Sequence, residues 1–246
     1  MTPYRCIIKQ TGIILIFISC IIPVSAQSTL GMTGLLNTPD ANMQTDGLFM
    51  AGANIMPEDM MPEVWDYNSG NYFLNITFFP FLEVAYRCTL FKDESNPVNK
   101  WQQDRSVSLR LRPLKEGYFH PSVVVGSNDV FTTHELNVLN KATGNRNFSS
   151  IYTVATKKID LSDNILDVTF GSYVFSRNTL YKGVFGGVKY SPSFLKPVSL
   201  IAEYDSNVIN VGLTSKLFNH LSLYAFSYDF RAISCGVRYE FCLIRN

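Results

Sequence analysis

The stretch Ile233-Ser234-Cys235-Gly236-Val237-Arg238-Tyr239-Glu240-Phe241 decides the fold, because its apolar side chains occupy every second position. Successive side chains of a β-strand point to opposite faces, so Arg238 and Glu240 share the face opposite the apolar one. The same period of two recurs throughout the chain from Gly47 onward, where a helical period of 3.6 does not fit. The pattern therefore predicts strands that have one apolar and one polar face.

Twelve such runs are expected, at residues 47–55, 71–79, 82–91, 105–112, 121–127, 150–158, 165–175, 183–190, 198–205, 208–217, 221–229 and 232–242. A run of about ten residues tilted by about 40° spans roughly 25 Å, the height of the apolar band of an outer-membrane barrel. The predicted fold class is all-β, a single antiparallel transmembrane β-barrel of about 12 strands over residues 47–242.

The connections between these runs alternate in length over the first half of the chain. The stretches Met56–Gly70, Lys92–Asp104 and Ser127–Ser149 are long, whereas Pro80-Phe81 and Asp160–Asp163 are short. Outer-membrane barrels have long loops on the outside and short turns in the periplasm. The alternation fades later in the chain, but it favours a membrane barrel over a soluble sandwich.

Composition excludes several other classes of protein. Of the 246 residues, 46% are hydrophobic and only 17% are charged, against roughly 25% charged residues in ordinary soluble domains. The 18 Phe and 13 Tyr exclude a disordered chain. The formal net charge of +1 gives no basic field for nucleic acid, so no nucleic-acid partner is expected.

The first 26 residues read as a secretory signal peptide. Arg5 and Lys9 precede an apolar run, and Pro23–Ala26 supplies small residues for cleavage. The string Phe17–Cys20 resembles a lipoprotein signal, but the apolar run continues past Cys20, which favours cleavage after Ala26. We therefore expect a short periplasmic or lumenal segment at 27–46, the barrel at 47–242 and a C-terminal tail at 243–246.

Charged side chains on the polar faces of the strands are expected to face the lumen, because a midplane Arg in lipid would cost about 2–4 kcal/mol. These candidates are Glu83, Arg87, Arg110, Arg112, Lys189, Glu203, Asp205, Arg238 and Glu240. Two interpretations are open. The favoured one is a structural salt-bridge network that packs a narrow barrel, and the other is a polar surface that contacts a ligand.

Catalytic chemistry finds little support in the sequence. The three histidines, His120, His134 and His220, have no convincing nucleophile beside them, and Ser122 near His120 fits a chance pairing. The sequence contains no phosphate-binding loop, nucleophile elbow or metal-ligand cluster. We therefore expect no catalytic residues, no cofactor and no metal site.

Several local strings follow one another in a fixed order along the chain. The first is Gly31-Met32-Thr33-Gly34-Leu35-Leu36-Asn37-Thr38-Pro39-Asp40-Ala41. The others are Pro80–Arg87, Ser108–Gly117, Pro121, Gly126–Asp129, Tyr152–Lys157, Gly183–Gly187 and Glu203–Asp205. Together they resemble the YjbH-like family of outer-membrane proteins linked to exopolysaccharide production, over about residues 31 to 213. The chain is much shorter than the long, multi-part members, and its last strand is followed by Cys242–Asn246 rather than ending on the aromatic residue.

This resemblance implies a non-enzymatic β-barrel in the outer membrane of a Gram-negative bacterium, where it takes part in export or surface assembly of an exopolysaccharide or capsule. The implied partners are outer-membrane lipid, exopolysaccharide and other polysaccharide-export proteins. Two alternatives stay open. One is an outer-membrane enzyme acting on lipid or glycan, and the other is a soluble secreted β-barrel or sandwich that binds a ligand.

Overall fold

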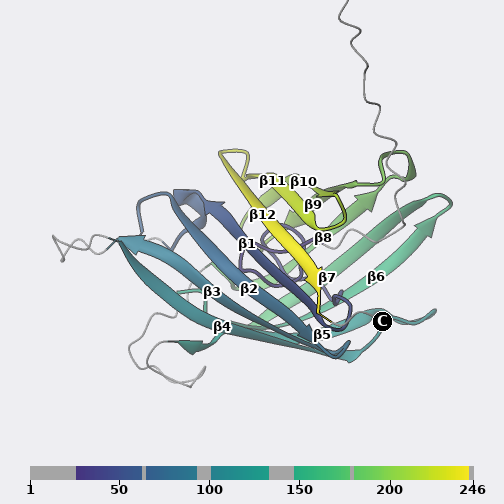
Figure 1. Ribbon diagram of the computed structural model, residues 1–246, viewed down its shortest axis with the longest axis horizontal. Coiled ribbons are helices and arrows are strands. Elements are labelled where there is room, and N and C mark those ends of the chain that lie inside the picture. Colours follow the sequence, from purple (N-terminus) through teal and green to yellow (C-terminus); the bar gives the residue numbers. More distant parts are fainter. Residues whose placement is uncertain (1–25, 63–64, 93–100, 133–146, 178–179, 244–246) are drawn as a thin grey trace, which may run out of the picture.

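A computed structural model describes residues 26–62, 65–92, 101–132, 147–177 and 180–243. They form a closed barrel in which each strand pairs antiparallel with the next one in the chain (Figure 1). The predicted signal peptide lies outside the described residues except for Ala26, and the predicted tail lies outside them except for Leu243. Within the described part of the chain, no helix has the length and apolar character needed to cross a bilayer.

The strands are β1 (Leu48–Met56), β2 (Ser69–Phe78), β3 (Leu82–Lys92), β4 (Trp101–Leu114), β5 (Ser122–Thr132), β6 (Ser150–Leu161), β7 (Asn164–Ser176), β8 (Gly183–Ser191), β9 (Val198–Tyr204), β10 (Ile209–Leu217), β11 (Leu221–Tyr228) and β12 (Ala232–Cys242). Two short 3-10 helices, η1 (Glu58–Met60) and η2 (Ser193–Leu195), lie in the connections. The barrel closes where β1 pairs with β12, from Leu48↔Cys242 to Ile55↔Cys235. The prediction of an all-β antiparallel barrel of about 12 strands is confirmed.

Strands β4 and β5 extend beyond the ends that the sequence pattern predicts. The pattern places them at 105–112 and 121–127, whereas they cover Trp101–Leu114 and Ser122–Thr132. The added segments mix polar residues with single apolar ones such as Trp101 and Phe131, so they show no regular alternation. They nevertheless continue the hydrogen-bonded ladders, with Lys92↔Trp101 as the last pair of β3 with β4.

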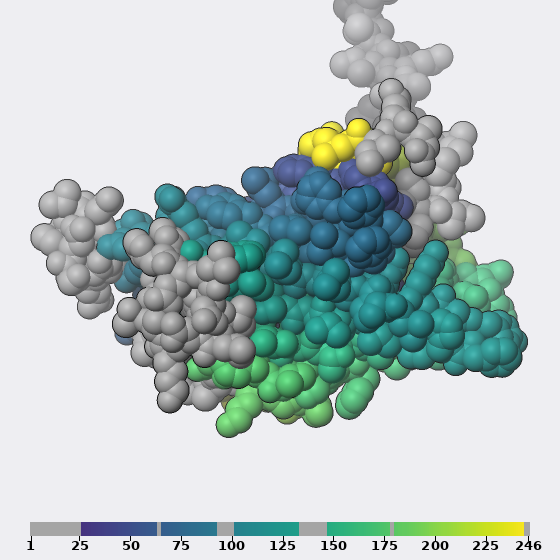
Figure 2. All heavy atoms as spheres, turned by 90° about the horizontal axis from the view of Figure 1, so that it is seen from below, coloured from purple at the N-terminus to yellow at the C-terminus, as the bar shows by residue number. Residues whose placement is uncertain are grey.

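The two faces of the wall differ sharply in exposure. Outward side chains such as Phe170 and Ile233 are 65% and 75% exposed, whereas Arg110 and Arg238 on the inner face are 1% and 3% exposed. Figure 2 shows the outer face, with the teal strands β4 and β5 across its middle and their connection projecting at one end. An outward apolar band of this kind is typical of barrels that span an outer membrane.

The barrel has two distinct ends. One end, here called the loop end, carries the connections at 57–68, 93–100, 133–149, 177–182, 205–208 and 229–231. The other, here called the turn end, carries those at 79–81, 115–121, 162–163, 192–197 and 218–220. The longest connections all belong to the loop end, as the alternation in the sequence indicates.

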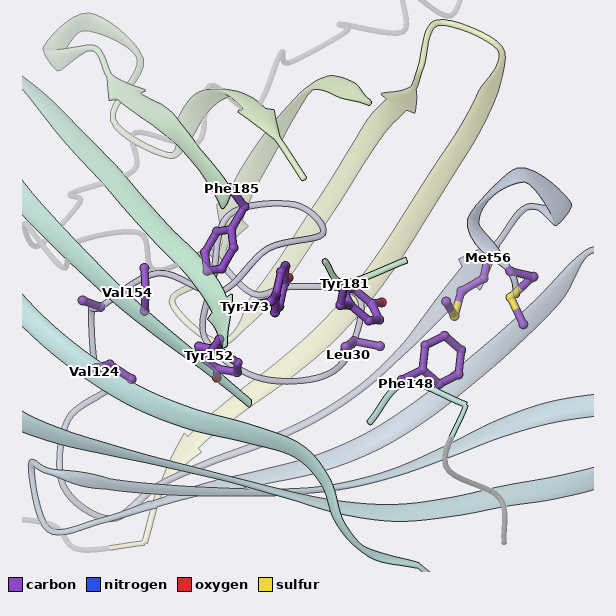
Figure 3. Close-up of a cluster of buried hydrophobic side chains, with 11 residues drawn as sticks. Leu30, Met56, Val124, Phe148, Tyr152, Val154, Tyr173, Tyr181 and Phe185 are labelled. Atoms are coloured by element: carbon purple, nitrogen blue, oxygen red, sulfur yellow. The ribbon is translucent and has the colours of Figure 1, made fainter. Parts of the chain in front are cut away.

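Inside the barrel, aromatic rings lie over glycines on neighbouring strands. Phe73 faces Gly52, and a Cβ placed on Gly52 would lie 2.4 Å from the ring of Phe73. Tyr152 covers Gly126 in the same way, and a Cβ on that glycine would lie 2.3 Å from the Tyr152 hydroxyl oxygen. Directly paired Gly–aromatic positions pin the strand register and let large rings fill a narrow interior. Tyr152 and its neighbours form the buried cluster of Figure 3.

Candidate functional site

The N-terminal segment fills the interior of the barrel (Figure 1, purple). Every residue from 26 to 41 is buried. The segment has no strand or helix of its own and contains only two isolated bridges, Gln27↔Thr33 and Gly34↔Pro39. A buried backbone without regular hydrogen bonding needs other partners for its N–H and C=O groups. We call residues 26–46 the plug, and the wall side chains that bind it form the candidate site.

Glu203 at the end of β9 binds three successive backbone N–H groups of the plug. Its carboxylate accepts hydrogen bonds from the N–H groups of Leu36, Asn37 and Thr38 at 3.1, 2.7 and 3.3 Å, and from the Thr38 hydroxyl at 2.8 Å. Successive N–H groups that converge on one anion form a nest, a backbone site for negative charge. A wall carboxylate occupies the nest and holds this loop against β9.

Glu83 on β3 binds the plug from the opposite side of the ring of strands. One of its carboxylate oxygens accepts hydrogen bonds from the backbone N–H and the hydroxyl of Thr33 at 2.8 and 3.0 Å. The other oxygen lies 3.5 Å from Nε of Arg110. The two glutamates therefore hold the plug between β3 and β9.

Arg110 on β4 binds carbonyl groups of the plug. Its guanidinium donates to the carbonyl oxygens of Thr33, Asp40 and Asn42, the last two at 2.6 and 2.8 Å. Burial raises the pKa of the Asp40 carboxyl above its usual range, and the charges of Lys189 and Arg110 oppose that rise. One buried arginine thus gives three plug carbonyl groups the partners that a strand would otherwise provide.

Asparagines on β1 and β2 bind further plug carbonyls, although they are not among the charged residues predicted to face the lumen. The side-chain amides of Asn54 and Asn71 donate to the carbonyl of Thr29 at 2.9 and 2.8 Å. The amide of Asn75 donates to the carbonyl of Gly31 at 2.7 Å. Their signal in the sequence is an amide on the inward face of a strand whose outward face is mostly apolar, such as Asn71 and Asn75 opposite Tyr72 and Leu74.

Asp205 joins the plug to the β9–β10 connection. Its carboxylate accepts from the side-chain amides of Asn37 and Asn210 at 2.8 and 3.0 Å, and from the backbone N–H groups of Asn207 and Val208 at 3.2 and 3.1 Å. The side chain therefore fixes a tight connection at the loop end and holds the plug at the same time.

The remaining predicted lumen residues pair mainly within the wall. Arg87 donates to Asp129 at 2.7 Å, and its guanidinium lies 4.5 Å from the centre of the Phe148 ring. The other wall pairs, each at 2.7 Å, are Lys189–Asp167, Arg238–Glu240 and Lys216–Glu240. Arg238 also approaches the plug, with Nη1 3.5 Å from Oε1 of Gln27.

Arg112 departs from the expected lumen position. It is half-buried, and its guanidinium donates to the carbonyl of Pro80 in the connection between β2 and β3. The pairing of β4 with β5 shifts register between Leu111 and Leu114, so strict alternation ends at this point. A shift of this kind redirects the side chains that follow it.

Ser122 and the described histidines, which were considered for catalysis, contact backbone carbonyl groups. The Ser122 hydroxyl donates to the plug carbonyl of Ala41 at 2.8 Å. His120 lies exposed at the turn end, with Nδ1 3.4 Å from the carbonyl oxygen of Pro121. Nδ1 of His220 lies 3.0 Å from the carbonyl oxygen of Glu240, and His134 lies outside the described residues.

Comparisons with known proteins identify relatives of this chain. The family model YjbH, described as "Exopolysaccharide biosynthesis protein YbjH", matches residues 26–210. The uncharacterized lipoprotein YjbH of Escherichia coli (strain K12) is 26% identical over 220 residues, which cover 78% of this chain and 30% of that protein. The chain therefore spans about a third of the length of this relative.

Two solved structures of outer-membrane proteins match this chain at low similarity. One is outer membrane phospholipase A from Escherichia coli, with a TM-score of 0.38 and 12% identity over 82% of this chain and 99% of that chain. The other is the calcium-bound outer membrane phospholipase dimer of Salmonella typhi, with a TM-score of 0.36 and 12% identity over 80% of this chain and 90% of that chain. Likeness at this level carries no argument about activity.

Proposed function

Because the chain belongs to the YjbH family of exopolysaccharide biosynthesis proteins, we propose that it is a non-enzymatic outer-membrane barrel that takes part in export or surface assembly of an exopolysaccharide or capsule. The family description is the reason for naming a polysaccharide as the molecule that is exported or assembled. The outward apolar band, with Phe170 and Ile233 at 65% and 75% exposed, supports a place in the membrane. The loop end then faces the outside of the cell, and the turn end faces the periplasm.

One observation about the interior carries the mechanistic part of the proposal. Glu203, Glu83 and Arg110 are bound to the backbone of the plug rather than directed at an open channel. While the plug is docked, the lumen of the barrel is closed. A polysaccharide chain could pass through the lumen only after the plug has left it. This arrangement favours a role as a gate or an assembly platform over that of an open pore.

An enzymatic role is the second candidate, and it is weaker. The Ser122 hydroxyl donates to Ala41, and the buried carboxylate of Glu203 accepts four hydrogen bonds from the plug. General acid–base work requires a group that can reach a substrate. Neither group offers that access while the plug is in place.

The experiment is deletion of the gene in its own host and measurement of extracellular and cell-bound polysaccharide. We expect a lower amount of surface glycan and recovery by the wild-type gene. The His120→Ala variant should restore glycan as well as wild type does, because we assign no catalytic role to this imidazole, which lies exposed at the turn end. Unchanged glycan in the deletion strain would refute the proposed function, and failure of only the His120→Ala variant would favour an enzyme.

A further inference from the structure

A cluster of aromatic side chains stands at the loop end of the barrel, apart from the plug site. Trp65 and Tyr67 lie in the β1–β2 connection, Phe91 near the end of β3, and Trp101 at the start of β4. The Trp65 ring stacks on Tyr67 and Phe91 with centroids 6.0 and 5.5 Å apart, and Tyr67 meets Trp101 edge to face at 5.9 Å. We call these four residues the aromatic rim. It contains both tryptophans of the chain.

A lysine is fixed against the aromatic rim. The Lys92 ammonium lies 4.6 Å from the centre of the Tyr67 ring and 5.5 Å from that of Trp101. The backbone N–H of Lys92 also donates to the Tyr67 hydroxyl at 2.6 Å. Contact of an ammonium group with two ring faces restrains an otherwise flexible side chain. The result is a positive charge held beside aromatic surface, with Trp101 still 48% exposed.

The position of the rim distinguishes it from an aromatic belt that borders the outward apolar row directly. On the outward face of paired β3 and β4, the row that begins at Leu82↔Leu111 continues through Tyr86↔Val107 to Cys88↔Arg105. Arg105 is exposed and donates twice to Gln103, at 2.9 and 2.7 Å. Trp101 lies four residues beyond Arg105, roughly 13 Å further along the strand. On β4, the polar side chains of Gln103 and Arg105 therefore separate Trp101 from the outward apolar row.

The rim leads inward to polar groups that lack protein partners. Trp65 meets Phe148 edge to face at 6.3 Å, and the Arg87 guanidinium lies over the Phe148 ring, 4.5 Å from its centre. Nε and Nη1 of Arg87 and Oδ1 of Asp104 are buried without a hydrogen-bond partner. Phe148 also contacts Tyr181 at 6.4 Å, which joins the rim to the buried cluster in Figure 3. Buried donors and acceptors of this kind call for water or a polar ligand.

We propose that the aromatic rim is a binding platform for an anionic polysaccharide. The apolar C–H face of a pyranose ring packs on exposed indole and phenol surface, and hydroxyl groups of the sugar hydrogen-bond at the ring edges. Lys92 and Arg105 supply positive charge for a sugar carboxylate, which neutral glycans lack. The choice of polysaccharide as the occupant rests on the proposed function, whereas the preference for an acidic one rests on Lys92 and Arg105.

The test is a titration of the full-length protein in detergent with oligogalacturonate, an acidic probe, and with maltooligosaccharide, a neutral one, followed by tryptophan fluorescence and calorimetry. We expect the acidic probe to bind more tightly. Trp101→Ala should weaken its binding at least tenfold, and Lys92→Gln should bring the affinity of the acidic probe close to that of the neutral one. Phe194→Ala is the matched control, because Phe194 is 85% exposed at the turn end.

Three results would overturn the platform: no binding of the acidic probe, equal affinity of Trp101→Ala and wild type, or equal weakening by Phe194→Ala. A second measurement places the rim relative to the membrane. Brominated lipids should leave the tryptophan fluorescence of the reconstituted protein unchanged, and strong quenching would assign the rim to the bilayer interface instead. Binding in vitro together with unchanged glycan in the deletion strain would refute the proposed function but not the platform.

Discussion

The charged side chains that bind the plug differ from those that pair within the wall. Glu203 and Lys189 lie on neighbouring strands and are both buried, but Glu203 binds backbone N–H groups of residues 36–38, whereas Lys189 pairs with Asp167 of the adjacent strand. The partners of a wall pair are present whenever the barrel is closed. The partners of a plug-bound charge are present only when the plug is docked. The charges that pair within the wall therefore stabilise the barrel itself. The charges that bind the plug make the stability of the barrel depend on whether the plug is docked.

Deletion of residues 27–46 should have the largest effect, because it leaves Glu203 and Glu83 without most of their hydrogen-bond donors. Loss of a partner from a buried charge costs about 3–5 kcal/mol. We expect a much lower temperature for the heat-dependent shift in gel migration, and an open channel in planar lipid bilayers. The Thr45→Ala variant is the control, because Thr45 is exposed. A deletion variant with wild-type conductance would show that the plug does not close the lumen.

An outward charge should have the next largest effect. Val237 is 42% exposed on the lipid-facing side of β12, whereas its neighbour Arg238 is 3% exposed. Val237→Arg should impair membrane assembly by about 2–4 kcal/mol if the residue lies near the midplane. Arg238→Gln should assemble well, because Glu240 keeps Lys216 and Ser222 as partners. Heat-modifiable migration of outer-membrane fractions measures both, and equal assembly of the two variants would contradict the assignment of the faces.

Two carboxylate-to-amide variants compare a charge that binds the plug with a charge that pairs within the wall. Glu203→Gln places an amide against the N–H groups of residues 36–38, and Asp167→Asn weakens one wall pair. An unsatisfied buried group costs about 1–3 kcal/mol, so both variants should lose thermal stability. Of the two variants, only Glu203→Gln should also raise the conductance, since Glu203 hydrogen-bonds to the plug whereas Asp167 pairs with Lys189 of the wall. Equal conductance of the two variants would contradict the distinction between charges that bind the plug and charges that pair within the wall.

The smallest effect is expected at Arg112. Its side chain is half-buried and donates to the carbonyl of Pro80 outside the lumen. Arg112→Gln should change stability by less than about 0.5 kcal/mol and leave conductance unaltered. Thermal unfolding in detergent measures this change. A loss of stability as large as that of Glu203→Gln would show that Arg112 stabilises the interior of the barrel.

The wall and most of its inward charges could be predicted from the sequence, whereas the contacts of the plug could not. Period-two alternation in runs such as Ile233–Phe241 specifies which side chains face lipid, because a slip of one residue would bury the wrong set. The plug has no such period. It is recognised through its backbone N–H and C=O groups, which every residue carries, so the side chains of residues 26–46 do not reveal its partners. The Arg112 side chain was placed by alternation alone, and the register shift beside it has no clear signature in the sequence.

The closure of β1 on β12 has a consequence for the order of assembly. The plug immediately precedes β1 in the chain, and β12 is the last of the barrel strands in chain order. Arg238 of β12 approaches Gln27 of the plug, so the final strand meets both the first strand and the segment inside it. A wall that closed early would trap Glu83 and Glu203 around an empty space. We therefore expect the N-terminal segment to act as a template around which the nascent sheet curls, so that the seam forms last on a lumen that is already filled.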